Sequence, residues 1–245
     1  MITASKLSKS FAEVKALSEL SFQVNSGEVY GLLGPNGAGK TTTLRILATL
    51  IEASSGTASV NGFDIKKDAE EVRKSIGVVN GGMGLYDRLT GKEVLYYFAS
   101  FYGMSKAATD KRIKELDDLL DLGDTLSRRT TGFSTGMKQK IVIARAVLHD
   151  PPVIFFDEAT SGLDIMARRA VMNFVKAYPS QSRAVIYSTH VMSEVEELCD
   201  RVGIIYKGKL IAEDKVEALI EQSGERNLEN AFFKLIERSG SEMHT

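Results

Sequence analysis

The chain has 245 residues, 43% of them hydrophobic and 26% charged, with a formal net charge of −1. This length and apolar content can bury a substantial core, either in one large α/β domain or in a domain with a subdomain. The near-neutral charge argues against a surface built for nucleic acid or anionic membranes, and the single cysteine, Cys199, excludes an internal disulfide.

Strand-like apolar runs dominate the first part of the chain. Residues 20–24 and 29–33 are two such runs, separated by the turn signal Asn25-Ser26-Gly27, and they predict an N-terminal β-layer. Residues 57–60 and 76–79 are also predicted to be strands, with a charged helix near residues 68–74 between them.

A glycine-rich sequence follows residues 29–33 and precedes the helix-like residues 42–47. It reads Gly34-Pro35-Asn36-Gly37-Ala38-Gly39-Lys40-Thr41, a complete phosphate-binding loop between a strand and a helix, as the motif requires. Its glycines let backbone N–H groups surround an anion, and the helix directs its positive end to the same place. We expect Lys40 to reach the β- and γ-phosphates and the Thr41 hydroxyl to bind Mg²⁺.

From about residue 90 the apolar residues recur at helical spacing, which predicts a helical subdomain over residues 90–150. Within it, Phe133-Ser134-Thr135-Gly136-Met137-Lys138-Gln139-Lys140 opens a helix, with Ser134 as a natural N-cap. Taken alone, this sequence predicts a capped helix and nothing more.

Two buried strands are predicted at residues 153–156 and 184–187, and their alternation with helices favours a mainly parallel sheet covered on both faces. Asp157 and Glu158 end the first strand, at the sheet edge where such folds bind ligands. Asp157 can hold Mg²⁺ through water, and Glu158 can orient or deprotonate an attacking water. An Asp-Glu pair alone is more often a pair of solvated loop acids, but the strand and the phosphate loop favour a site.

Five sequences occur in a fixed order: residues 34–42, 133–139, 153–158, 161–164 (Ser-Gly-Leu-Asp) and 188–190 (Ser-Thr-His). Together they resemble the nucleotide-binding subunits of ABC transporters, over residues 7 to about 235. The resemblance implies an α/β P-loop NTPase cassette with a mainly parallel core sheet, an N-terminal antiparallel β-layer and a helical subdomain. We predict one nucleotide-binding domain over residues 1–245, divided into a core with β-layer (1–89 and 151–214), a helical signature subdomain (90–150) and a C-terminal tail (215–245). In the tail the spacing of Leu228, Ala231, Phe232 and Leu235 predicts an amphipathic helix.

The resemblance also implies which residues bind ATP and Mg²⁺. The ATP-binding residues are Phe11, which matches the aromatic that stacks on adenine, and Gly34, Pro35, Asn36, Gly37, Ala38, Gly39, Lys40, Thr41 and Thr42. Thr41 and Asp157 correspond to the Mg²⁺ ligands, and Lys40, Glu158 and His190 to the catalytic residues. Outside this context a lone aromatic is more often core, and a histidine after a strand is more often structural.

In the resembling family, the signature helix and the phosphate loop of one chain lie too far apart to bind the same ATP, so two cassettes face each other head to tail. The residues implied to reach the partner's ATP are Ser134, Thr135, Gly136, Met137 and Asp164. ATP would close the dimer and hydrolysis would reopen it.

Two positions depart from the family pattern. Ala159 replaces the proline that usually follows the Asp-Glu pair, and we expect this replacement to have a mild effect. More seriously, the glutamine expected after residues 76–79 is absent, and the coupling loop there begins with Asn80 and Gly81. We expect water to complete the Mg²⁺ shell, with Asn80 at most an indirect ligand.

Residues 84–90, 134–140 and 198–200 resemble exporter cassettes of the ABC-2 class, and among them the sodium-extruding NatA type. The implied partners are a second cassette and a separate membrane permease, with the chain held at the cytoplasmic face of the membrane. Apolar residues over 82–102 predict the permease-docking region. The apolar runs of the chain are too short to cross a bilayer, so we expect another chain to supply the membrane part.

Two other readings remain open from the sequence. A soluble cassette acting on nucleic acid or ribosomes is disfavoured by the near-neutral charge and the lack of tandem cassettes or a long coiled-coil insertion. A catalytically weak interaction module is disfavoured by the intact Lys40, Asp157, Glu158 and His190, although the missing glutamine supports it.

Overall fold

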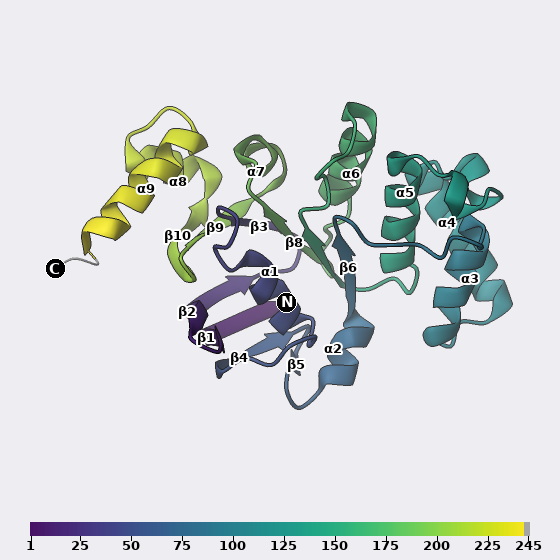
Figure 1. The fold of residues 1–245 in the computed structure, drawn as a ribbon, viewed down its shortest axis with the longest axis horizontal. Helices are drawn as coiled ribbons and strands as arrows, with labels where there is room; N and C mark the ends of the chain where they lie inside the picture. Colours follow the sequence, from purple (N-terminus) through teal and green to yellow (C-terminus); the bar gives the residue numbers. More distant parts are fainter. Residues whose placement is uncertain (243–245) are drawn as a thin grey trace.

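The structure is a computed structural model that describes residues 1–242. It contains two β-sheets (Figure 1). The antiparallel sheet has the strand order β2-β1-β4-β5, and the six-stranded core sheet has the order β10-β9-β3-β8-β7-β6. The strands are β1 (Ile2–Phe11), β2 (Val14–Val24), β3 (Val29–Leu33), β4 (Ser55–Val60), β5 (Phe63–Asp64), β6 (Ile76–Asn80), β7 (Val153–Asp157), β8 (Ala184–Thr189), β9 (Arg201–Tyr206) and β10 (Lys209–Lys215).

The core sheet is parallel except for β10, which pairs antiparallel with β9. Its strand β7 shows why the sequence has a continuous apolar run there. Ile154 and Phe156 pack with the helices on one face, whereas Val153 and Phe155 pack with α1 and the antiparallel sheet on the other. Alternate side chains point to opposite faces, so burial on both faces requires every position to be apolar.

The helices are α1 (Lys40–Leu47), α2 (Ala69–Ser75), α3 (Gly91–Phe101), α4 (Lys106–Leu120), α5 (Thr135–Ala146), α6 (Ile165–Ala177), α7 (Met192–Leu198), α8 (Val216–Ser223) and α9 (Leu228–Glu242). Short 3-10 turns lie at Gly123–Leu126 and Thr130–Gly132. Side-chain caps fix several helix starts. Thr90 and Glu93 form a reciprocal capping box at α3, and Ser134 and Asp164 accept backbone N–H bonds at α5 and α6.

The predicted fold class is confirmed, with an antiparallel N-terminal sheet, a mostly parallel core sheet and helices α3 to α5 together at one side (Figure 1). The run at residues 29–33 lies in the core sheet, beside β8 and β9, and not in the antiparallel layer. The sequence did not reveal β9 and β10. Gly203 interrupts the apolar run of β9, and charged residues break the apolar pattern of β10.

The tail contains α8 and α9, whose buried Val216, Leu219, Leu228 and Phe232 pack with Leu33 and other residues of the core sheet. The last three residues of the predicted tail, 243–245, lie outside the described residues. Over residues 1–242, no helix combines the length and the apolar character that a membrane crossing requires.

Candidate functional site

The phosphate loop connects the end of β3 to the start of α1. Gly39 is the N-cap residue of α1 with φ at +114°, a conformation that favours glycine, and a Cβ there would lie 2.6 Å from Leu17 Cδ2. The loop borders a pocket of about 320 Å³ lined by Ala16, Asn36, Gly37, Gly39, Lys40, Thr41, Thr42 and Glu158. The structure thus places most of the predicted phosphate-binding residues around one hollow at a helix N-terminus.

Lys40 is buried in this loop, with 4% of its side chain exposed. Its Nζ donates to the carbonyl oxygens of Gly34 at 2.7 Å and Pro35 at 3.2 Å, and it lies 3.5 Å from Glu158 Oε1. Burial lowers the pKa of the Lys40 ammonium, and the Glu158 carboxylate opposes this shift. Lys40 is therefore a cation held at the loop by acceptors on several sides.

The carboxylates predicted after the buried strand lie at its C-terminal end. Asp157 ends β7 and accepts a hydrogen bond from Ser188 Oγ at 3.0 Å. Glu158 follows with φ at +50°, a strained conformation for a residue other than glycine. Its backbone N–H donates to the carbonyl of Ser188 at 3.0 Å, which ties the loop after β7 to the end of β8.

His190 comes directly after β8 and faces the same carboxylate. Its Nδ1 lies 3.4 Å from Glu158 Oε1, and 46% of its side chain is exposed. Lys40 and His190 therefore approach one oxygen of Glu158 from two different elements. The three residues predicted to be catalytic are brought together by the structure.

The side chains at the loop suit a magnesium ion that arrives with a nucleotide. Among the described residues no group of three or more His, Cys, Asp or Glu side chains could hold a metal ion. The predicted ligands Thr41 and Asp157 supply only oxygen atoms, and Mg²⁺ is usually bound through one or two protein oxygens, substrate phosphates and water. The donor set therefore fits Mg²⁺ bound with a phosphate substrate.

The coupling loop begins beside Asp157. Asn80 pairs in register with Asp157 across β6 and β7, and the backbone N–H of Gly81 donates to the Asp157 carbonyl at 3.0 Å. A Cβ at Gly81 would lie 2.6 Å from the carbonyl oxygen of Glu158. A glutamine at position 81 does not fit this backbone, whereas Asn80 lies next to the proposed metal ligand.

The signature helix α5 lies far from α1, on the other side of β6 and β7 (Figure 1). No residue of α5 lines the described pocket at the phosphate loop. Ser134 caps α5 by accepting from the Met137 N–H at 3.2 Å, and Asp164 caps α6 by accepting from the Ala167 N–H at 2.9 Å. None of the residues predicted to act on a partner's ATP lines the pocket at this chain's own phosphate loop.

Phe11 lies at the end of β1, beside the turn to β2. The residue is 47% exposed, and the Lys9 ammonium lies 5.0 Å from the centre of its ring. Phe11 does not line the described pocket, although Ala16 on the adjacent strand does. Its predicted stacking on adenine stays a prediction.

Gln139 makes a contact with the loop after β7 that the sequence did not reveal. Its Nε2 donates to the Ala159 carbonyl at 2.9 Å, and only 7% of the residue is exposed. Ser188 likewise holds Asp157 in place. Gln139 and Ser188 both belong to the five sequences named above. Their hydrogen-bond partners are 20 and 31 residues away in the chain, so only the fold identifies these partners.

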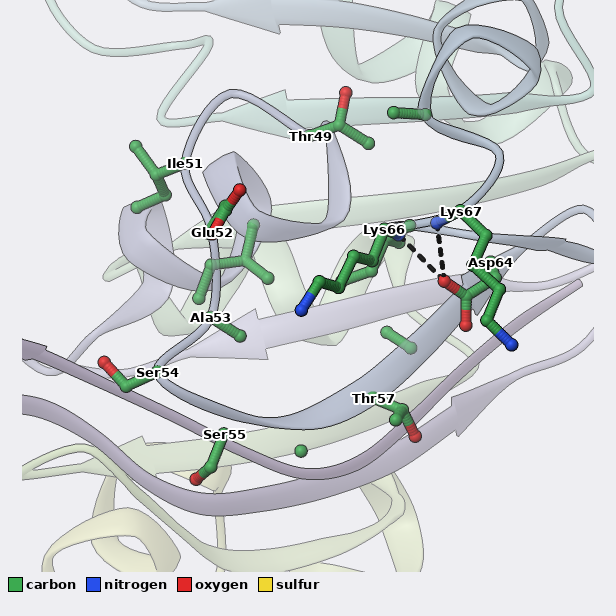
Figure 2. Close-up of a pocket in the computed structure, with 15 residues that line it drawn as sticks. Thr49, Ile51, Glu52, Ala53, Ser54, Ser55, Thr57, Asp64, Lys66 and Lys67 are labelled. Carbon is green, nitrogen blue, oxygen red and sulfur yellow. Dashed lines mark hydrogen bonds between the residues drawn. The ribbon is translucent and has the colours of Figure 1, made fainter.

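A separate cavity of about 360 Å³ lies between β4, the segment after β5 and the loop that follows α1 (Figure 2). The side chain of Lys66 extends across it, and the Asp64 carboxylate accepts the backbone N–H groups of Lys66 and Lys67 at 2.9 Å each. It shares no lining residue with the pocket at the phosphate loop.

Comparison with protein families and relatives agrees with the motif pattern. The model of the ABC transporter family matches residues 17–161. The ABC transporter ATP-binding protein NatA of Bacillus subtilis is 42% identical over 97% of this chain and 99% of its own length. The Nod factor export ATP-binding protein I of Burkholderia lata is 38% identical over 87% of this chain and 70% of its own length.

Solved structures with the same fold include ATP-binding cassettes. An ATP-binding subunit of an ABC transporter matches with a TM-score of 0.87 at 30% identity, over 96% of this chain and 99% of that chain. The cassette MJ0796, in a dimeric post-hydrolysis state bound to ADP and Pi, matches with a TM-score of 0.78 at 25% identity, over 88% of this chain and 98% of that chain.

Proposed function

This chain belongs to the ABC transporter family of ATP-binding cassettes and is an ATPase, and we propose that it powers an exporter whose membrane permease is a separate protein. The convergence of Lys40 and His190 on Glu158 at the C-terminal edge of the core sheet supports the hydrolytic site, and the similarity to export ATP-binding proteins supports export. The proposal includes the division of the chain into a core, a helical signature subdomain at residues 90–150 and a tail.

In the proposed mechanism, backbone N–H groups of the phosphate loop and Lys40 hold the phosphates of ATP. Magnesium bound with the nucleotide, through Thr41 and Asp157, would neutralise phosphate charge. Glu158 accepts a hydrogen bond from the attacking water at its carboxylate and takes its proton as the water attacks. His190 fixes the position of that carboxylate and contacts the γ-phosphate, so catalysis consists of positioning and charge neutralisation.

A second copy completes each site in this proposal. The supporting observation is the distance of α5 from the phosphate loop of the same chain (Figure 1). Ser134, Thr135, Gly136, Met137 and Asp164 would contact ATP bound to the partner, and ATP would hold the two copies together. The dimeric state of the structural relative MJ0796 supports this arrangement.

The proposed cargo is sodium, with the cassette at the cytoplasmic face of the membrane. Support comes from the resemblance of the ABC-2-like segments to sodium-extruding exporters and from the similarity to NatA along the whole chain. The test is ATP-driven uptake of sodium into inside-out membrane vesicles that contain this chain and its co-purifying permease. Vesicles carrying the Glu158→Gln chain serve as the matched control, and equal uptake in both would overturn the proposal.

The aromatic residues after the coupling loop form the proposed docking surface for the permease. Tyr86 packs edge-on against Tyr97 at 5.2 Å between ring centres, and Tyr97 packs against Phe101 at 5.0 Å. These three residues are 50%, 43% and 66% exposed. Leu95 is fully buried and belongs to the helical core, so it is not part of this surface.

Charge substitutions on this surface should release the cassette from its permease. We expect Leu85→Asp and Tyr86→Asp to abolish co-purification with the permease in membranes, because a carboxylate cannot be desolvated in an apolar contact without a partner. Affinity for ATP should stay at the wild-type value. Leu119→Asp, at an exposed leucine on α4, is the matched control, whereas Leu85 itself is partly buried against the helical core. Co-purification that survives both substitutions would place the docking surface elsewhere.

Asn80 should make a small contribution to hydrolysis. We expect Asn80→Ala to lower the steady-state ATPase rate only a few-fold, because water can replace an indirect ligand of the magnesium ion. The rate is measured in parallel with Glu158→Gln over a range of Mg²⁺ concentrations. A loss as deep as that of Glu158→Gln would show that Asn80 performs the role of the missing glutamine.

A further inference from the structure

A buried carboxylate lies between the two loops that carry Glu158 and His190. Glu194 is on α7, which follows the His190 loop, and its side chain is 1% exposed. A charge buried this deeply is costly to desolvate unless strong hydrogen bonds replace water. On α7 it shares a face with the buried Val195 and Leu198, where an apolar residue would be the ordinary choice.

Four donors surround this carboxylate. Its Oε1 accepts from the Thr160 hydroxyl at 2.7 Å and lies 3.0 Å from Arg168 Nε. Its Oε2 accepts from the hydroxyls of Tyr187 at 3.0 Å and Thr189 at 2.8 Å. Burial raises the pKa of the Tyr187 phenol, so this hydroxyl remains a donor. Each carboxylate oxygen therefore has two donors, which replace the water lost on burial.

Two of these donors are close in sequence to the proposed catalytic pair. Thr160 is two residues after Glu158, and Thr189 directly precedes His190. Glu158 has a strained backbone, with φ at +50°, and such a conformation persists only where neighbouring structure holds it. The Glu194 carboxylate is thus a bridge between the loop that contains this strained residue and the loop that contains the histidine.

We infer that Glu194 is a positioning residue for ATP hydrolysis. By binding the hydroxyls of Thr160 and Thr189 at once, it fixes the separation of the Glu158 carboxylate and the His190 imidazole. Arg168 extends the bridge to α6, the helix that Asp164 caps. Glu194 acts only through these neighbours, and the inference rests on the roles proposed above for Glu158 and His190.

A neighbouring ion pair provides a matched control. Arg169 on α6 pairs with Glu197 on α7, so it joins the same two helices. These side chains are 57% and 39% exposed, and neither donates to nor accepts from the two catalytic loops in the hydrogen bonds of the described residues. If Glu194 only held α6 against α7, removing the charge of Glu197 should have a similar effect on activity. If Glu194 positions the catalytic residues, only its own replacement should lower activity.

The test uses the purified full-length chain with MgATP, assayed well below the Tm of each variant. Glu194→Gln should lower kcat by roughly ten- to a hundredfold with little change in KM, because a small displacement of catalytic groups slows the chemistry without removing phosphate contacts. Glu197→Gln should leave kcat unchanged.

The two threonines test the bridge itself. Thr160→Val and Thr189→Val each remove one hydroxyl without changing the size of the side chain, and each should lower kcat. The double variant should lose no more than the more severe single variant, because the bridge is broken once either end is released. These variants also test the inference if Glu194→Gln does not fold.

Wild-type kcat in Glu194→Gln, or strictly additive losses in the double threonine variant, would overturn the inference. Glu158→Gln is assayed in the same series. If Glu158→Gln hydrolyses ATP at the wild-type rate, the proposed role of Glu158 is wrong. If it is inactive while Glu194→Gln is fully active, only the role of Glu194 is wrong.

Discussion

Replacing Glu158 with Gln should lower ATP hydrolysis by at least about a hundredfold and leave ATP binding intact. The amide keeps the size of the side chain but cannot take a proton from water. It also removes the negative charge 3.5 Å from Lys40 Nζ, which leaves the full charge of Lys40 available to the phosphates. Steady-state hydrolysis and equilibrium ATP binding measure the two effects separately.

The same variant should accumulate as a dimer with MgATP, because ATP that is not hydrolysed continues to join the two copies. Light scattering or size-exclusion chromatography with and without MgATP measures this. Glu71→Gln, at an exposed carboxylate on α2 that pairs with Lys74, is the control. A Glu158→Gln chain that stays monomeric at every ATP and protein concentration tried would contradict the two-copy site.

Replacing Lys40 with Ala should nearly abolish hydrolysis and also weaken ATP binding by roughly ten- to a hundredfold. A hydrogen bond between charged groups contributes about 1.5–3 kcal/mol, and Lys40 is the buried cation of the phosphate loop. Glu158→Gln and Lys40→Ala therefore differ in binding, although both lose activity. Isothermal titration with ATP and steady-state hydrolysis show the difference.

A lysine outside the pocket provides the control for Lys40→Ala. Lys67 is exposed and lies at the separate cavity, so Lys67→Ala should keep both binding and hydrolysis (Figure 2). A thermal unfolding curve for each variant separates loss of function from loss of folded protein. Wild-type ATP affinity in a folded Lys40→Ala chain would show that backbone N–H groups alone bind the phosphates.

The sequence alone was enough to predict the phosphate loop and the cassette fold. The loop consists of eight consecutive residues, and its backbone conformation depends on glycines within those eight. Its ability to bind phosphate can therefore be predicted without tertiary structure. The buried strands β7 and β8 were predictable for a related reason. Strands covered on both faces are apolar at almost every position, so they appear in the sequence as short continuous apolar runs.

The sequence was not sufficient to predict the arrangement of the coupling loop. Counting along the family pattern from Ile76 and Gly77 puts the expected glutamine at Gly81, and a one-residue shift would put it at Asn80. The pairing of β6 with β7 places Asn80 beside Asp157 and presses the backbone of Gly81 against the carbonyl of Glu158. This placement comes from strand register, which depends on a partner more than 70 residues away in the chain, and the replacement of the glutamine by Asn80 stays a prediction.

The surroundings of Glu158 were decided by tertiary structure alone. Its contact with His190 spans 32 residues of sequence, and the bond from Thr160 to Glu194 spans 34. Local sequence identified Glu158 and His190 as candidates through their motifs, but gave no sign that Glu194 lies between their loops. A short helix can carry a carboxylate into the interior only where the fold supplies donors for it, and these donors come from β8, α6 and the loop after β7.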